Sequence, residues 1–332
     1  MSVVRCPFPL SFPPRPGAAV ESETGPITWP PPELAVAPVQ LPPTAPAVGE
    51  NGVRRYDGLS YATNSGYRPR LLDLSVPAGA EAGAEPPAVV VWIHGGAWME
   101  GDRRYPPPTV SADLLFGSLL RAGLAVATID YRHAREAPFP AQLHDVKAAL
   151  RYLRHYAGTL GIDGTRIGLW GESAGGHLAA LAGLTGTADT ADPGLEGTEG
   201  IAEGDTTVAV VVDWYGVADV AALLAEWSSE PDNPLVTFLG TDPAARPRLA
   251  AAAGPVTYAH TSAPPFLLIH GTHDTVVPFT HSERLADLLQ AAGNHAELVP
   301  VPGAEHIFLN ADIAPLVTRS VAFLTHHLRR SP

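Results

Sequence analysis

The chain has 332 residues, 45% of them hydrophobic, which is enough to bury a large core and excludes a disordered protein. Its formal net charge of −13, from 21 Lys and Arg against 34 Asp and Glu, argues against nucleic acid or an anionic membrane as the main partner. The single cysteine, Cys6, excludes an internal disulfide, and the longest apolar runs are too short to cross a bilayer.

The N-terminal segment is rich in proline. The first 50 residues contain 13 prolines, and proline both fixes φ and lacks the N–H that a helix interior needs. We therefore predict an extended arm over residues 1–52, which could contact a second copy of the chain and leaves a homo-oligomer open. Because Cys6 follows no apolar segment of the kind found in signal peptides, we expect a cytoplasmic protein.

From residue 53 onward, predicted strands alternate with predicted helices. Leu72, Leu74 and Val76 alternate with polar positions, as in a half-buried strand. Strands buried on both faces are predicted from continuous apolar runs at residues 89–93, 124–129, 208–212 and 266–269. Apolar stripes at helical spacing predict helices around residues 143–157, 285–289 and 314–328. This alternation predicts an α/β fold with a mostly parallel central sheet flanked by helices, in one domain over residues 53–332.

Two insertions interrupt the alternation, and we interpret residues 187–258 as lid-like. Residues 187–205 carry six acidic side chains and no basic one, which predicts a solvated surface loop. Residues 217–258 contain Trp227, Phe238 and scattered prolines, which favour short helices over the mouth of the sheet.

A serine lies between a predicted strand and a predicted helix. Residues 170–176 read Trp-Gly-Glu-Ser-Ala-Gly-Gly, and they match the Gly-x-Ser-x-Gly pattern of a nucleophile elbow. The glycines two positions before and after the serine keep side chains away from a strained turn. The pattern therefore predicts that Ser173 is a nucleophile.

A serine nucleophile needs a histidine base, and that base needs an acid that fixes its tautomer. In elbow-type sites the order along the chain is serine, acid, histidine. Asp274 and His306 occur in this order, each after a predicted strand, so they fall at the same edge of the sheet as Ser173. Asp213, which ends another predicted strand, is the alternative acid and ranks second.

The segment His-Gly-Gly-Ala-Trp at residues 94–98 directly follows a predicted strand. Acyl transfer passes through an oxyanion that needs preorganised N–H donors. We expect one donor from the backbone of Ala174 and another from Gly96, with Gly95 and Ala97 as further candidates. His94 is expected to brace this loop rather than to perform chemistry.

The pocket is less well marked by the sequence. Candidate lining residues are Trp98, Tyr131, Trp214 and Ile307, each of which could equally belong to the core. No group of His, Cys, Asp or Glu has the spacing of a zinc site, so no metal is expected.

Five motifs in this order resemble the α/β-hydrolase superfamily, and within it the hormone-sensitive-lipase-like and feruloyl-esterase-like (BD-FAE) esterases. The motifs are His-Gly-Gly-Ala-Trp at 94–98, Asp-Tyr-Arg at 130–132, Gly-Glu-Ser-Ala-Gly-Gly at 171–176, His-Gly-Thr-His-Asp at 270–274 and Gly-Ala-Glu-His at 303–306. The resemblance covers residues 53–330. It implies the α/β-hydrolase fold, a triad of Ser173, Asp274 and His306, and no cofactor.

The chain departs from these relatives at two places. Ala97 stands where many relatives have a third glycine, and the proline-rich arm cannot supply the helical cap of hormone-sensitive-lipase relatives. We therefore expect a small or absent cap and place the chain closer to the feruloyl-esterase-like group.

The resemblance implies a serine carboxylesterase that hydrolyses small, short-chain or modestly bulky esters through an acyl-enzyme. An amidase, peptidase or formamidase stays open, because amide cleavage uses the same base and oxyanion. A non-catalytic binding protein of this fold is the third alternative, and the presence of all three triad residues disfavours it.

Overall fold

The computed structural model describes residues 40–64, 68–79, 85–186, 192–227, 233–259 and 262–329. Most of the predicted arm, residues 1–39, lies outside the described residues. The rest of the arm joins the sheet: residues 47–48 pair antiparallel with the next strand, and the N–H of Leu41 donates to the carbonyl of Ser60 (2.9 Å). The predicted boundary at residue 52 therefore divides two paired strands.

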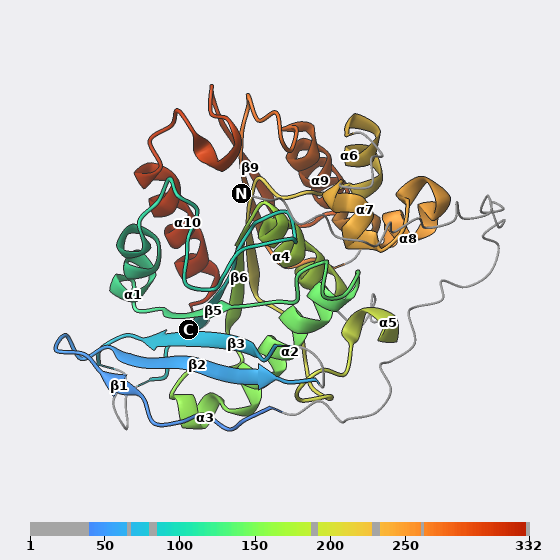
Figure 1. Ribbon diagram of the computed structural model, residues 1–332. Coiled ribbons are helices and arrows are strands. Elements are labelled where there is room, and N and C mark those ends of the chain that lie inside the picture. The colour runs from blue at the N-terminus through green and yellow to red at the C-terminus, as the bar shows by residue number, and fades with distance from the viewer. Residues whose placement is uncertain are drawn as a thin grey trace, which may run out of the picture.

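The described strands form one sheet in the order β1-β2-β3-β5-β4-β6-β7-β8-β9 (Figure 1). The β1–β2, β2–β3 and β3–β5 pairs are antiparallel, and the remaining pairs are parallel. The strands are β1 Ala47–Val48, β2 Arg54–Ala62, β3 Arg70–Val76, β4 Val89–Ile93, β5 Ala125–Ile129, β6 Ile167–Glu172, β7 Val210–Trp214, β8 Phe266–Gly271 and β9 Ala296–Val301. This mostly parallel sheet confirms the predicted fold class.

Helices cover both faces of the sheet. Helices α1 and α10 lie on one face, and α2, α4 and α9 lie on the other (Figure 1). The helices are α1 Ser118–Arg121, α2 Ala141–His155, α3 Ala157–Leu160, α4 Ala174–Thr185, α5 Pro193–Glu196, α6 Val220–Glu226, α7 Pro234–Leu239, α8 Pro247–Ala252, α9 Thr280–Ala291 and α10 Ala314–His327. A π-helical turn spans Asp113–Gly117, and 3-10 turns span Pro243–Ala245, Pro255–Tyr258 and His306–Phe308. Across the described residues, none of the helices has the length and apolar character that a membrane crossing requires.

The side chains of β4 show why the sheet needs helices on both faces. All five residues of β4 are buried, with Val89, Val91 and Ile93 in the core under α2 and α4 and with Trp92 in the core under α1 and α10. On that second face the indole of Trp92 packs edge-on against those of Trp170 and Trp214 (ring centroids 5.7 and 6.4 Å apart). A continuous apolar strand is stable only in such a sandwich, because either exposed face would place apolar surface in water.

The predicted insertion folds into short helices, as the sequence indicated for residues 217–258, and Phe238 of α7 is fully buried. The prediction of a solvated acidic loop is wrong for residues 192–201, most of which are half-buried or buried, and holds for residues 202–205, which are exposed. Leu195 of α5 is buried, Glu196 forms an ion pair with Lys147 of α2, and Glu199 forms one with Arg132 (2.8 Å). Glu196 and Glu199 are therefore counterions for buried cations, which the composition of the loop alone does not show.

Candidate active site

A sharp turn between β6 and α4 carries Ser173. Its φ of 53° and ψ of −120° are strained for a residue with a side chain, and its N–H donates to the carbonyl of Trp214 (2.9 Å). Only glycine fits two positions before and two positions after Ser173, because a side chain there would overlap the neighbouring backbone. A Cβ on Gly171 would lie 2.1 Å from the carbonyl oxygen of Gly175, and a Cβ on Gly175 would lie 2.1 Å from that of Ile93.

Three predicted site residues form one hydrogen-bonded chain. The Nε2 atom of His306 lies 3.1 Å from Oγ of Ser173, and its Nδ1 lies 2.7 Å from Oδ2 of Asp274. Asp274 follows β8 and His306 follows β9, so the carboxyl ends of neighbouring strands bring the three together. The carboxylate is fully buried, and the imidazole side chain is 17% exposed.

The environment of Asp274 favours its ionised form. Burial acts to raise the pKa of Asp274, but hydrogen bonds from His270 and His306 outweigh burial and hold the pKa below its usual range. The N–H groups of Val276 and Val277 also donate to Oδ1 (2.9 and 2.8 Å). An ionised Asp274 accepts the Nδ1 proton of His306, which leaves Nε2 of the neutral imidazole as an acceptor facing the serine hydroxyl.

The alternative acid, Asp213, has a different role. Its Oδ1 accepts the N–H of Gly216 (2.9 Å), and burial raises its pKa to about 6. The carboxylate in contact with His306 is that of Asp274. The imidazole of His270, a rival base beside Asp274, is held by Oγ of Ser282 (2.7 Å) and the carbonyl of Val277 (2.8 Å).

The structure separates the four predicted oxyanion donors into two groups. The N–H of Gly95 donates to Oε1 of Glu172 (2.8 Å), so the expectation that Gly95 supplies a donor is wrong. Ala174 is the first residue of α4, where a helix N–H has no partner within the helix. Across the described residues, the N–H groups of Gly96 and Ala97 have no protein acceptor either. Gly96, Ala97 and Ala174 therefore remain the candidate donors.

Tyr131 supports the loop after β4 instead of lining a pocket. Its ring is fully buried and stacks on the imidazole of His94 (centroids 4.3 Å apart), and its hydroxyl donates to the carbonyls of His94 (3.0 Å) and Gly95 (3.2 Å). Burial lowers the pKa of His94 to about 4, so this imidazole is neutral at pH 7. His94 thus braces the loop, as the sequence led us to expect.

Two further pocket candidates are also core residues. Trp98 is 1% exposed, stacks on Phe238 of α7 (centroids 4.4 Å apart) and donates from Nε1 to Nδ1 of His177 (3.2 Å). Trp214 is fully buried on the opposite face of the sheet and donates to Oγ of Ser320 (3.0 Å). Placing these side chains in a pocket was wrong, because packing within the sheet sandwich covers them. Ile307, the fourth candidate, is half-buried beside His306.

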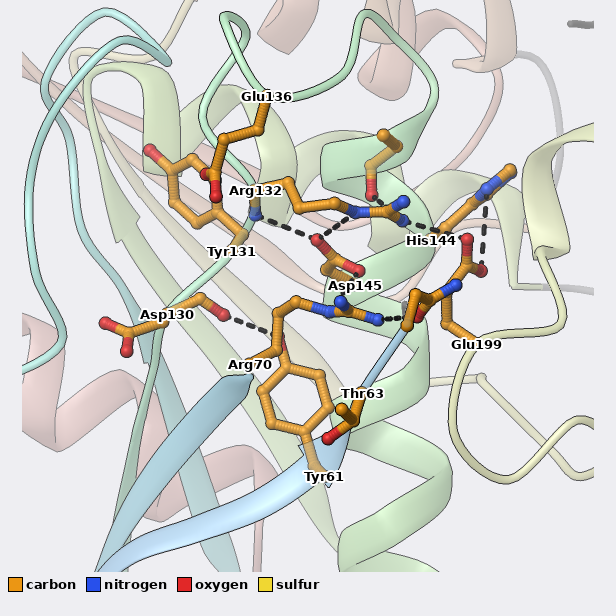
Figure 2. Close-up of polar contacts among 12 residues, drawn as sticks. Tyr61, Thr63, Arg70, Asp130, Tyr131, Arg132, Glu136, His144, Asp145 and Glu199 are labelled. Carbon is orange, nitrogen blue, oxygen red and sulfur yellow. Dashed lines mark hydrogen bonds and ion pairs between the residues drawn. The ribbon is translucent and has the colours of Figure 1, made fainter. Parts of the chain in front are cut away.

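A buried charge network holds the segment that carries Tyr131. Figure 2 shows Asp145 of α2 between two arginines: its Oδ1 lies 3.3 Å from Nε of Arg70, and its Oδ2 lies 2.9 Å from Nε of Arg132. Oδ2 also accepts the backbone N–H of Arg132 (2.8 Å), and the guanidinium of Arg132 continues to Glu199. The network therefore fixes the backbone next to Tyr131, and through Tyr131 it supports the loop after β4.

Sequence reasoning missed Tyr215, which follows β7. Its ring packs edge-on against the imidazole of His306 (centroids 4.9 Å apart), and its φ is 43°. Burial and the nearby carboxylate of Glu172 raise the pKa of its phenol. Its place after a strand at the same edge of the sheet is the one signal that could have identified it.

A cavity of about 420 Å³ adjoins the loop after β4. Its lining includes Gly95, Gly96, Glu172, Glu100 and Tyr105. A second cavity, of about 480 Å³ around Arg154 and Asp163, lies at the amino end of β6 and shares no residue with this site. The described residues contain no group of three or more His, Cys, Asp or Glu side chains that could hold a metal ion.

Comparison with known proteins gives consistent matches. The family model BD-FAE matches residues 72–289. Esterase LipQ of Mycobacterium tuberculosis is 33% identical over 267 residues, which cover 77% of this chain and 58% of LipQ. Esterase LipC of the same organism is 32% identical over 290 residues, which cover 85% of this chain and 65% of LipC. The chain thus spans less than two thirds of the length of either relative.

Solved structures show the same likeness. A truncated carbohydrate esterase from gut microbiota superposes with a TM-score of 0.69 at 30% identity, over 86% of this chain and 99% of that one. An esterase of Thermogutta terrifontis with propionate bound superposes with a TM-score of 0.61 at 25% identity, over 82% of this chain and 93% of that one.

Proposed function

Since the chain belongs to the BD-FAE family, we propose that it is a serine carboxylesterase that hydrolyses small-molecule esters through an acyl-enzyme. The observation that carries this proposal is the hydrogen-bonded chain from Ser173 through His306 to Asp274. The esterases among its relatives support the same chemistry. The net charge of −13 supports a small molecule rather than nucleic acid as the substrate.

In the proposed first step, Oγ of Ser173 attacks the ester carbonyl carbon while Nε2 of His306 takes the hydroxyl proton. The negative charge that forms on the carbonyl oxygen is stabilised by the N–H groups of Ala174, Gly96 and Ala97. Asp274 stabilises the imidazolium through Nδ1. The C–O bond then breaks, and the leaving alcohol takes the proton from Nε2.

In the second half, His306 accepts a proton from water, and the hydroxide attacks the acyl-enzyme. The same N–H donors stabilise the second oxyanion. Breaking the bond to Oγ of Ser173 releases the carboxylic acid and returns the proton to the serine.

The test compares wild type with Ser173→Ala on p-nitrophenyl acetate and butyrate. Ser75→Ala, at a half-buried position in β3, is the matched control, since it removes a hydroxyl far from the turn. We expect wild-type rates from the control and a fall of at least about 10³-fold from Ser173→Ala. Equal rates in wild type and Ser173→Ala would refute the proposal.

Two further measurements separate the alternatives. A fluorophosphonate should label wild type and Ser75→Ala but not Ser173→Ala, whereas a non-catalytic binding protein would leave all three unlabelled. The p-nitroanilides of the same acids test the amidase alternative, and turnover of the anilides above that of the esters would decide against an esterase.

A further inference from the structure

We propose that Glu172 is a positioning residue whose carboxylate fixes the Gly95 peptide, so that the following N–H groups of Gly96 and Ala97 face the oxygen of the reacting carbonyl. This inference rests on the proposed esterase function and deepens it. Glu172, the residue before the nucleophile, would act through the loop after β4 and not by touching the substrate carbonyl.

The contact between Glu172 and Gly95 is short and direct. Glu172 is the last residue of β6 and 7% exposed, and its Oε1 accepts the N–H of Gly95 at 2.8 Å. The two strands are neighbours, with Ile93 of β4 paired to Gly171 of β6, so the side chain reaches only across one strand spacing. A Cβ on Gly95 would lie 2.3 Å from Oε1, which shows that the glycine backbone rests against the carboxylate.

A buried carboxylate at this position destabilises the fold relative to an apolar side chain, unless it makes a contact that an apolar side chain cannot make. Burial of an ionised group without a counterion is strongly unfavourable. Burial raises the pKa of Glu172, whereas the N–H of Gly95, the nearby His306 and the hydroxyl of Tyr215 act in the opposite direction and favour the ionised form. Buried carboxylates with a perturbed pKa occur preferentially at functional sites.

The loop that Glu172 holds has a backbone that needs external support. Three consecutive residues have positive φ: Gly96 (100°), Ala97 (51°) and Trp98 (58°). For the two with side chains, this conformation is unfavourable, and it persists only when surrounding contacts impose it.

Two contacts impose it from opposite sides of the Gly95 residue. The hydroxyl of Tyr131 binds the carbonyl oxygens of His94 and Gly95, whereas Glu172 binds the N–H of Gly95. Without the Glu172 contact, the peptide between His94 and Gly95 is held only at its carbonyl by Tyr131, and its N–H is free to change direction. The N–H groups that follow would then lose their common direction, and the stabilisation of the oxyanion would fall while substrate binding would not.

The experiment uses three substitutions in the full chain. Glu172→Met removes the acceptor at similar length, Glu172→Gln keeps an acceptor oxygen but removes the charge, and Glu50→Gln is the control. Glu50 is exposed in the turn between β1 and β2, at the edge of the sheet, so its substitution removes an equal charge away from the loop after β4. The measured quantities are kcat, KM and the Ki of a trifluoromethyl ketone, which adds Ser173 and places an oxyanion in the site.

We expect Glu172→Met to lower kcat by about 10²-fold, as the loss of an oxyanion donor does, with KM within about threefold of wild type. The Ki of the ketone should weaken by a similar factor. Glu172→Gln should restore kcat to within about tenfold of wild type, and Glu50→Gln should match wild type. Near-wild-type kcat in Glu172→Met, or an equal fall in Glu172→Gln, would overturn the proposal.

Thermal unfolding of each variant shows whether it is folded. If Glu172→Met does not fold, Glu172→Ala removes the same acceptor without filling the space and is judged by the same criteria. A wild type without Ser173-dependent turnover would refute the proposed function. If the wild type is active and Glu172→Met keeps the wild-type kcat, only the role of Glu172 is refuted.

Discussion

Replacing Asp145 by Asn should destabilise the protein by about 3–5 kcal/mol. Asp145 is fully buried in α2 and contacts two guanidinium groups, those of Arg70 at 3.3 Å and Arg132 at 2.9 Å (Figure 2). The two arginine side chains are themselves 0% and 3% exposed. The substitution keeps the shape of the side chain and removes only the charge.

The expected loss of stability depends on which of the two arginines loses its counterion. Arg132 keeps Glu199, whose Oε1 lies 2.8 Å from Nη2. Arg70 keeps no carboxylate within ion-pair distance in the part of the chain that the structure describes, although it contacts the amide oxygen of Asn64. An unpaired, desolvated guanidinium accounts for most of the expected cost, since breaking one side of a buried pair costs more than the pair contributes.

The measurement is equilibrium unfolding in urea, with Asp57→Asn as the control. Asp57 pairs with Arg55 at 3.9 Å, but both side chains are more than 60% exposed (66% and 62%), so its loss should cost less than about 1 kcal/mol. The reasoning is refuted if Asp145→Asn and Asp57→Asn lower the free energy of unfolding equally.

Two further outcomes are expected. Asp274→Asn should lower kcat by about 10³–10⁴-fold. The N–H groups of Val276 and Val277 bind the oxygen at the Oδ1 position, so the amide NH₂ would face Nδ1 of His306 and favour the wrong tautomer. Asp213→Asn is its control in steady-state kinetics, and a fall below tenfold for Asp274→Asn would contradict the role. The free energy of unfolding should fall as pH drops from 6.5 toward 4. In the folded protein, burial lowers the pKa of three histidines to about 4, and unfolding returns each pKa to 6.5; the three are His94, His177 and His281. The unfolded state then binds more protons, with a slope of at most about 4 kcal/mol per pH unit. Asp213, with its pKa raised to about 6, opposes this slope below pH 6 by about 1.4 kcal/mol per unit. Urea unfolding at pH 7, 6 and 5 measures the free energy of unfolding, and a value that does not change with pH would contradict the lowered pKa values of the histidines.

The fold could be predicted because its strands and helices have strong periodic patterns. The apolar run at residues 89–93 coincides with β4, and the stripe predicted near residues 143–157 is α2, Ala141–His155. The run at 208–212 becomes β7 two residues later, at Val210–Trp214. The reason is that pairing with β6 begins at Gly168 and Val210, and hydrophobicity does not mark where pairing begins.

The site could be predicted only as far as its motifs extend. Ser173 and His306 have local signals, a turn and a position after a strand. The hydrogen bond from the N–H of Gly95 needs the side chain of Glu172, which comes from a neighbouring strand 77 positions away in sequence. The burial of Tyr131 and Trp214 likewise depends on partners from other elements. Contacts of this kind are absent from any local pattern, which is why the pocket was the weakest prediction.

The backbone marks the same edge of the sheet independently of any motif. In the described residues, positive φ at residues other than glycine occurs at Ala97, Trp98, Ser173, Tyr215, Ile307, Phe308 and Asn310. These seven residues lie in four segments, which follow β4, β6, β7 and β9. Such strain persists only where surrounding structure imposes it, and it clusters at functional sites. If the strain were a by-product of tight turns in general, it would also occur at the amino ends of the strands. Its restriction to the carboxyl ends argues that the buried supports, including Tyr131 and Glu172, hold this edge in a conformation that the local sequence would not adopt alone.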